Sequence, residues 1–508
     1  MKLFSPFALA TVICLCAGAN ARPDSFGNAF GPRFRGAQTI HPNRSPKKAL
    51  DSLHRWNQIA INASGLDHTP VAPGDPRVFG EQLGPGRSSR AMAIVHIAIF
   101  DSVTALLGGY NSYTGVQADR GPVSLDAAVA QAAHDTLTAL YPSQAASFDT
   151  LLADDLALIK NKNGKANGIG LGQRAAAAIL AMRVGDGAQV PEPRVNIDHL
   201  TSDLAGHWRQ DPISLIPLAL GGHWGDCIPF VVHSSSQFGV PPPPDMTSYE
   251  YATAYNEVKS VGGDGVITPT LRTAEQTFIG IFWAYDGTPS LCAPPRLYNQ
   301  IAVHIADQMK LGTKDLARLL ALVNTAMADA AMSIWESKYS YDLWRPITGI
   351  RESDPGTGPT GTGDGNPQTI GDPTFTPLGA PASNLAGPNF TPPFPAYPSG
   401  HAGFGGALFQ TMRRFFGTDA IAFTFVSDEF NGNTKDHNGN VRPYMPRSFS
   451  SLSQAEEENG QSRIYLGIHW SFDKTQGIAQ GRRVADYVFD NAFTPIRKKW
   501  RGSGRLQF

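Results

Sequence analysis

The sequence predicts an all-α protein, with helical bundles joined by long loops that are rich in glycine and proline. Apolar residues recur at helical spacing in both halves of the chain, and the alanine-rich segments lack the alternation that is typical of strands. The 508 residues include 52 Gly and 39 Pro, yet 42% of them are hydrophobic. This composition provides both loops and a substantial core.

The first residues have the order of a secretory signal peptide. Lys2 supplies a positive charge, residues 7–18 form an apolar run, and Ala19-Asn20-Ala21 offers small residues for cleavage. We expect residues 1–21 to be removed and the mature chain to be exported, to the periplasm or outside the cell, without a membrane anchor. A short buried helix is the alternative interpretation of the same residues.

An irregular mature N-terminus is expected at residues 22–50, where Pro, Gly, Arg and Asn occur without periodicity. Residues 51–246 are predicted to form an N-terminal helical bundle and a connector. The helices of this bundle are expected at residues 87–107, 126–141, 145–159 and 172–183. The prolines that follow these helices would interrupt any long element, so we expect a connector over about residues 187–246.

Residues 247–508 are predicted to form a C-terminal helical bundle that carries the functional site. Its helices are expected at residues 270–285, 295–310, 313–338, 399–416, 452–466 and 471–491. A stretch crowded with Gly, Pro and Thr at 353–398 is too long for a simple connection. We interpret it as either a lid-like functional loop or an insertion.

Charge and cysteine content exclude some classes of function. Lys and Arg total 42 against 43 Asp and Glu, so the net charge of −1 provides no overall field that would attract nucleic acid or an acidic membrane. Any anion selectivity must therefore be local. Two of the four cysteines lie in the signal segment, and Cys227 and Cys292 can form one disulfide or remain as buried thiols.

The first cluster of candidate residues is the pair Lys338 and Arg345 in the segment KYSYDLWRP. On a continuous helix, residues seven apart would share a face, although Pro346 disfavours helical geometry at Arg345. Two cations that converge in this way would suit a single anion. A solvated Lys and Arg near a helix end is the alternative.

The second cluster is Ser399-Gly400-His401, which precedes an apolar helical segment. Free backbone N–H groups and the positive end of the helix dipole favour an oxyanion at such a position. Gly400 would let the backbone approach a ligand closely. The alternative is an N-cap serine followed by an incidental histidine.

The third cluster contains Arg463, His469 and Asp473 in the segment SRIYLGIHWSFD. A His and an Asp four residues apart can meet on one helical face. Asp473 could then accept one imidazole N–H and leave the other nitrogen of His469 as a nucleophile or a ligand. A histidine satisfied by hydrogen bonds within the core is the alternative.

The three clusters occur in a shared order and spacing, written Lys-x6-Arg-Pro, Pro-Ser-Gly-His and Ser-Arg-x5-His-x3-Asp. This arrangement resembles the vanadium-dependent haloperoxidases and their relatives, the type 2 phosphatidic acid phosphatases and the bacterial acid phosphatases. The segments FWAYDG, PPRLYNQIA, LWRPITGIR and FPAYPSGHAGFGGALFQ are similar to chloroperoxidase segments of the vanadium type. The resemblance covers about residues 275–480, with a fainter similarity at 87–105.

The resemblance implies a vanadate cofactor and a role for each site residue. The equatorial oxygens of vanadate would be bound by Lys338, Arg345, Ser399, Gly400 and Arg463. His469 would be the axial ligand of the metal, and His401 the acid–base residue, effective near its ordinary pKa of about 6.5. Asp286 in FWAYDG would pair with Arg463 and fix its guanidinium group.

The activity implied is oxidation of chloride or bromide by hydrogen peroxide to hypohalous acid, with vanadium as a Lewis acid. Trp335 and Phe394 match chloroperoxidase positions that the bromoperoxidases fill with other residues, although either aromatic could be ordinary core packing. The organic acceptor of the halogen and the oligomeric state stay open.

Phosphate has the same shape as vanadate, so the same donors would also suit a secreted acid phosphatase. His469 would then attack phosphorus to form a phosphohistidine, and His401 would protonate the leaving group. A catalytically silent helical protein is the third class considered, and it is disfavoured because every motif position is filled.

Overall fold

The computed structural model describes residues 25–34, 51–72, 74–382, 387–436 and 438–496. Helices dominate these residues, which confirms the all-α prediction. The two strands among them are short and antiparallel, β1 (Phe423–Phe425) and β2 (Arg447–Phe449). The proposed signal peptide at residues 1–21 lies outside the described residues.

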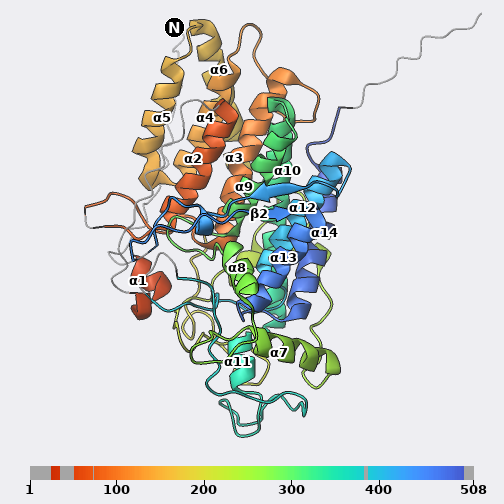
Figure 1. Cartoon of the computed structure of the whole chain (residues 1–508). Coiled ribbons are helices and arrows are strands. Elements are labelled where there is room, and N and C mark those ends of the chain that lie inside the picture. Colours follow the sequence, from red (N-terminus) through yellow and green to blue (C-terminus); the bar gives the residue numbers. More distant parts are fainter. Residues whose placement is uncertain (1–24, 35–50, 73, 383–386, 437, 497–508) are drawn as a thin grey trace, which may run out of the picture.

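Five of the N-terminal helices stand together at one end of the molecule (Figure 1). They are α2 (Ser52–Asp67), α3 (Gly84–Leu107), α4 (Leu125–Leu140), α5 (Ala145–Ala157) and α6 (Lys162–Met182). Helix α6 begins ten residues earlier than expected, in a segment whose glycines disfavour a helix. Gly168 and Gly172 face α4 so closely that a Cβ atom on either would lie 2.5 Å from a backbone oxygen, so helix packing outweighs propensity here.

The C-terminal helices begin after the connector. They are α7 (Tyr249–Val261), α8 (Ala274–Phe282), α9 (Pro294–Gln308), α10 (Thr313–Tyr341), α11 (Pro346–Arg351), α12 (Gly400–Phe416), α13 (Leu452–Tyr465) and α14 (Ser471–Asn491). The bounds of α9, α10 and α12–α14 agree with the expected ranges to within a few residues. Helix α8 is shorter than the expected 270–285, and α2, α7 and α11 were not predicted.

A short helix, α1 (Ser25–Phe30), corrects the expectation of an irregular segment at 22–50; residues 35–50 lie outside the described part of the chain. Short 3-10 turns complete the helical elements. They are Pro32–Phe34, Pro142–Gln144, Trp224–Asp226, Ser235–Phe238 and Asp428–Phe430.

Helix α10 is the centre of the core. It is buried along most of its length and packs against α3 on the N-terminal side and against α12 and α14 on the C-terminal side. Helices α3 and α10 are long and apolar enough to cross a membrane by length and composition alone. However, 83% and 100% of their apolar windows are buried inside the protein, so both are core helices.

Helices α12 and α14 lie side by side and begin at the same level (Figure 1). The backbone N–H of Ser399, just before α12, donates to the carbonyl of Asp473 in the first turn of α14 (3.0 Å). A Cβ atom on Gly477 would lie 2.6 Å from the carbonyl oxygen of Ser399, and one on Gly481 would collide with the carbonyl of Gly403. Close packing through glycine therefore brings the two helix starts together.

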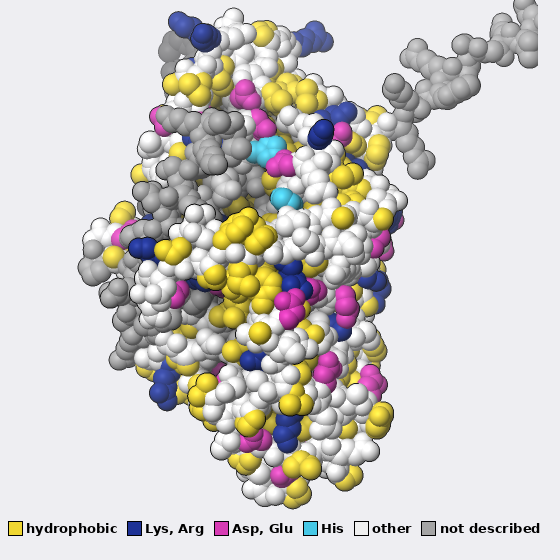
Figure 2. Space-filling model, in the orientation of Figure 1, with side chains coloured by type: hydrophobic (Ala, Val, Ile, Leu, Met, Phe, Trp, Pro, Cys, Tyr) yellow, Lys and Arg dark blue, Asp and Glu magenta, His cyan; other side chains and the backbone are white. Residues whose placement is uncertain are grey.

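Surface charge and cysteine state agree with the sequence. Basic and acidic side chains are mixed over the face shown in Figure 2, as the near-zero net charge indicates. Cys227 and Cys292 are both buried free thiols, which decides between the two alternatives that their number allowed.

Candidate oxyanion site

Lys338 and Arg345 converge on one place, but not along a single helix. Helix α10 ends at Tyr341, Asp342 turns the chain with a φ of 50°, and Arg345 caps the start of α11. Pro346, as the first residue of α11, thus ends the shared helical face that the spacing alone suggested. The turn, rather than helical periodicity, brings the two cations together.

Both cations are buried and held by backbone carbonyls of the loop before α12. The Nζ atom of Lys338 donates to the carbonyls of Pro395 (2.8 Å) and Ala396 (2.9 Å). Nε of Arg345 donates to the carbonyl of Phe394 (2.8 Å). Part of the 353–398 loop therefore orients the site. Burial and the neighbouring Arg345 charge lower the pKa of Lys338 well below its usual value.

Ser399, Gly400 and His401 occupy the predicted helix start. Ser399 is the N-cap of α12 and accepts from the N–H of Ala402 (3.4 Å), while Gly400 begins the helix. Nε2 of His401 donates to the carbonyl of Ala284 (2.5 Å). Burial, together with the positive charge of Arg463, lowers the pKa of His401 well below 6.5. This corrects the expectation of an unperturbed histidine.

Arg463, near the end of α13, forms the predicted ion pair with Asp286. Its two terminal nitrogens contact the two carboxylate oxygens at 2.5 and 3.1 Å, and both side chains are almost fully buried. Such a bidentate pair fixes the plane of the guanidinium group. The hydrogen bonds made by Asp286 leave Nε of Arg463 without a partner among the described residues.

His469 and Asp473 meet as predicted, with 2.7 Å between Nδ1 and Oδ2. His469 lies just before α14 rather than within a helix, and Asp473 also accepts from the N–H of Trp470 (3.0 Å) at the helix start. Nδ1 therefore carries the proton, and Nε2 keeps a lone pair, which accepts from Arg345 (2.9 Å). Burial and nearby cations lower the pKa of His469 well below 6.5, so the ring stays neutral.

The site contains more buried positive donors than the protein itself satisfies. Lys338, Arg345 and Arg463 are each at most 1% exposed. Within the described part of the chain, Nη2 of Arg345 and Nε of Arg463 have no hydrogen-bond partner. A buried donor without a partner costs about 1–3 kcal/mol. An anion with several acceptor oxygens would satisfy both groups, so these residues fit a tetrahedral oxyanion.

Trp335 and Phe394 pack against these cations. Their ring centroids lie 4.9 Å apart. Nζ of Lys338 lies 5.2 Å from the centroid of the Phe394 ring, and Cζ of Arg345 lies 4.9 Å from it. Both aromatics also line the cavity above the site.

The site forms the floor of a mostly apolar cavity. Asp286, Gly400, His401, Arg463 and His469 line the floor. Most of the walls could not be predicted from the sequence, because they come from segments far from the motifs. Phe30 of α1 and Phe390 of the long loop are examples.

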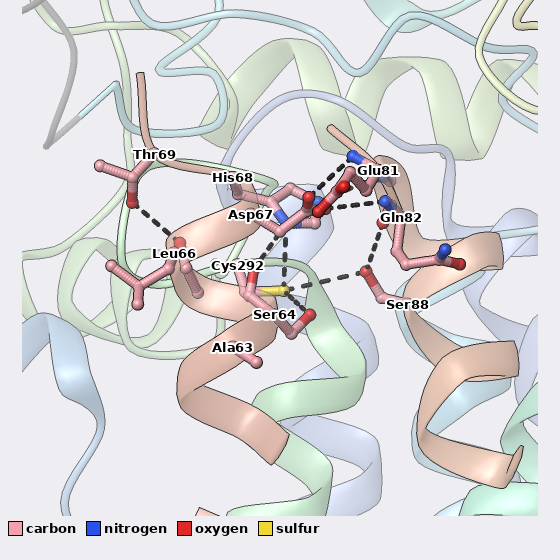
Figure 3. A network of polar contacts seen from close by, with 12 residues as sticks. Ala63, Ser64, Leu66, Asp67, His68, Thr69, Glu81, Gln82, Ser88 and Cys292 are labelled. Carbon is pink, nitrogen blue, oxygen red and sulfur yellow. Dashed lines mark hydrogen bonds and ion pairs between the residues drawn. The ribbon is translucent and has the colours of Figure 1, made fainter. Parts of the chain in front are cut away.

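His68, which caps α2, is a polar wall residue that the motifs do not include. The N–H of Gly84 donates to its Nε2 (3.0 Å), and its Nδ1 donates to the carbonyl of Ser64 (2.9 Å). Sγ of Cys292 lies 3.5 Å from Nδ1 and 2.9 Å from the Ser64 hydroxyl (Figure 3). These contacts tie α2 to the loop that carries Asp286.

Together, the fold and the site define a helical protein whose buried cations fit an oxyanion beside a histidine that keeps a lone pair on Nε2. A family profile described as the VCPO second helical-bundle domain matches residues 318–498. The chain is 30% identical over 495 aligned positions to vanadium chloroperoxidase of Curvularia inaequalis, covering 82% of this chain and 78% of that protein. The chain belongs to the family of vanadium-dependent haloperoxidases.

Solved structures share the fold. A bacterial vanadium-dependent iodoperoxidase superposes with a TM-score of 0.68 at 24% identity, covering 89% of this chain and all of that one. The apo form of a bacterial vanadium-dependent chloroperoxidase gives a TM-score of 0.59 at 15% identity, with 80% and 94% of the two chains covered. At these identities the structural likeness concerns the fold alone.

Proposed function

We propose that this protein binds vanadate and uses hydrogen peroxide to oxidise a halide to hypohalous acid. The observation that carries this proposal is the pairing of His469 with Asp473, which leaves Nε2 with a lone pair beside buried, partly unsatisfied cations. A nitrogen ligand and several oxygen-binding donors are what a tetrahedral metal oxyanion requires.

Each residue of the site has a distinct part in holding the cofactor. The oxygens would be bound by Lys338, Arg345, Ser399, Gly400 and Arg463, and His469 would be the metal ligand. The Arg345 contact to Nε2 of His469 would be exchanged for a contact to the anion. When bound, vanadate supplies a Lewis-acidic centre that activates hydrogen peroxide towards halide.

His401 would handle the proton of the reaction. Its Nε2 donates a proton to the carbonyl of Ala284, and burial together with the charge of Arg463 opposes a second proton on the ring. An anion bound to Arg463 offsets that charge, so the pKa of His401 rises when the site is filled. The histidine thus becomes a useful acid–base group in the loaded enzyme.

The test is halide oxidation by the purified protein after incubation with orthovanadate. Iodide, bromide and chloride are supplied in turn with hydrogen peroxide, and hypohalous acid is measured. The wild type should oxidise at least one halide, and His469→Ala should abolish the activity. His304→Ala, which changes an exposed histidine of α9, is the matched control and should retain it.

The same assay separates the two activities of the superfamily. An acid phosphatase would hydrolyse p-nitrophenyl phosphate without vanadate and would oxidise no halide at any pH. That result would replace the haloperoxidase proposal with the phosphohistidine mechanism. Which halide is preferred is decided by comparing the rates with iodide, bromide and chloride.

We also propose that the protein is exported after cleavage near residue 21, on the basis of the order of charged, apolar and small residues at 2–21. Mass spectrometry of the protein from its native host should give a mature N-terminus near Arg22. An intact Met1 on the purified protein would contradict this.

A further inference from the structure

The backbone carbonyl of His401 is contacted by two side chains from outside its own helix. Nδ2 of Asn459, on α13, donates to this carbonyl (2.9 Å), and the hydroxyl oxygen of Tyr298, on α9, lies 3.0 Å from it. Helices α9 and α13 both pack against α12, which His401 helps to begin (Figure 1). Two neighbouring helices therefore reach the backbone of the histidine that lines the oxyanion site.

The two side chains act on one another as well as on the carbonyl. A tyrosine hydroxyl has one proton to donate, and that of Tyr298 lies 2.8 Å from Oδ1 of Asn459. Burial raises the pKa of Tyr298, so the hydroxyl keeps this proton. Donation to Oδ1 fixes which end of the Asn459 amide is the oxygen. The NH2 end of the amide is then directed at the carbonyl of His401.

Formation of helix α12 does not require these contacts. A carbonyl in the first turn of an α-helix ordinarily accepts from the N–H four residues further on. Asn459 and Tyr298 are fully buried, and taking polar groups out of water is unfavourable unless they are hydrogen-bonded. Gly405 leaves space for the contact, since a Cβ atom there would collide with the Asn459 amide. The packing thus accommodates a buried polar contact where an apolar side chain could have filled the core.

The ring of His401 is held separately from its backbone. Nε2 donates to the carbonyl of Ala284 (2.5 Å), which lies two residues before Asp286. Asp286 pairs with Arg463, and Arg463 lies one helical turn after Asn459 on α13. One face of α13 therefore contacts the backbone of His401 directly and the segment that holds its ring through Arg463.

From this double anchoring, we infer that Asn459 and Tyr298 are positioning residues for His401, which hold its backbone so that the imidazole keeps a fixed place beside the bound oxyanion. This inference rests on the proposed function, in which His401 handles the proton. Neither side chain belongs to the described lining of the cavity, so neither contacts the reactants. Their effect on the reaction passes through His401, because proton transfer depends on the placement of the acid–base group.

The positioning is tested in the vanadate-free protein by NMR of 15N-labelled histidines. The Nε2–H of His401, which is buried and bonded to a carbonyl, should give a slowly exchanging downfield resonance that is absent from His401→Gln. Tyr298→Phe and Asn459→Leu each leave one donor beside the carbonyl, whereas the double variant leaves neither. We expect a small shift of the resonance in each single variant and, in the double variant, a shift larger than their sum.

Two matched controls remove similar contacts elsewhere in the fold. Tyr113→Phe removes a hydroxyl that donates to the carbonyl of Phe230, and Asn256→Leu removes an amide that donates to the carbonyl of Ala252. Both should leave the His401 resonance in place. An unmoved resonance in the double variant would overturn the inference. If the double variant does not fold, Tyr298→Phe, which removes a single oxygen atom, decides by the same criterion.

The consequence for the reaction is measured in the vanadate-loaded enzyme, with peroxide and the halide that the wild type oxidises fastest. In the double variant, kcat per bound vanadate should fall at least about tenfold, because the acid–base group is misplaced, while KM for the halide stays unchanged. An unchanged kcat would overturn the inference even if the resonance moves. A wild type that oxidises no halide would overturn the proposed function instead, and the resonance would still decide whether Asn459 and Tyr298 hold His401.

Discussion

The chemistry of individual residues in the site depends on where protons lie. Asp473 accepts a hydrogen bond from the Nδ1–H of His469, so that Nε2 faces the cations with a lone pair. The sequence spacing predicted this pair, since residues four apart at a helix start can meet. It could not predict the lowered pKa of His401, because the causes are burial in the folded protein and the charge of Arg463, which is distant in the chain.

Removing the orienting carboxylate should weaken cofactor binding. Asp473→Ala leaves Nδ1 of His469 without its acceptor, so either ring nitrogen can carry the proton. Loss of such a supporting contact typically reduces metal affinity about 10- to 100-fold, and orthovanadate titration should show a loss in this range. Asp490→Ala, on the exposed side of the same helix, is the control. Equal vanadate affinities of the Asp473 variant and the wild type would rule out the orienting role.

Arg463 should contribute directly to anion affinity. Its Nε has no protein partner in the described structure, so the anion gains a charge-assisted hydrogen bond there. Arg463→Ala should weaken vanadate binding by at least ~1.5 kcal/mol. Arg414→Ala, which changes a partly exposed arginine of α12, should leave the affinity unchanged. An unaltered dissociation constant for Arg463→Ala would refute this contribution.

At the scale of elements, the site depends on helix starts that are held together by close packing. The sequence predicted α12 and α14 well. Ser399 and Gly417 mark the two ends of α12, whereas α14 was recognised from its helical pattern alone. It did not reveal how closely the two helices approach. The glycines that allow this approach could equally have been assigned to loops. Only the packing against a neighbouring helix distinguishes a glycine at a helix contact from a glycine in a loop.

The α12–α14 contact can be tested at Gly481. Gly481→Ala forces a methyl group against the carbonyl of Gly403, and such overpacking costs typically about 1–3 kcal/mol of unfolding free energy. In Gly170→Ala, in α6, the added methyl group would make only an ordinary contact with the Arg174 side chain. This substitution should be neutral or should raise the unfolding free energy by about 0.5–1 kcal/mol. Urea unfolding of both variants measures the difference. A Gly481 variant as stable as the wild type would show that the helices can separate at no cost.

A histidine links α2 to α9 in a pH-dependent way. Hydrogen bonds to Asp51 and Asp307 raise the pKa of His54 to about 9. Since the folded pKa lies above the unfolded value near 6.5, the stability from this group is fully present below pH 6.5 and is lost as the pH rises through 9. The difference in unfolding free energy between the wild type and His54→Gln should therefore shrink from pH 6 to pH 10. A constant difference would contradict the linkage.

At the scale of the whole molecule, segments that are far apart in the sequence build one cavity. The motifs near residues 338, 399 and 469 and the Asp286 segment form the floor, and their order in the sequence sufficed to predict them. Phe30, His68 and Ile216 form walls that no local pattern indicated, because their position follows from how the N-terminal helices, the connector and the long loop pack around α10. Long-range packing of this kind leaves no periodic signal in the sequence.

A crystal structure of the protein soaked with orthovanadate tests the central proposal most directly. We predict vanadium bonded to Nε2 of His469, with its oxygens contacted by Lys338, Arg345 and Arg463 and by the start of α12. The contact between Arg345 and Nε2 should be broken in that complex. Vanadate bound elsewhere, or a site in which Arg345 still occupies Nε2 at saturating vanadate, would contradict the assignment.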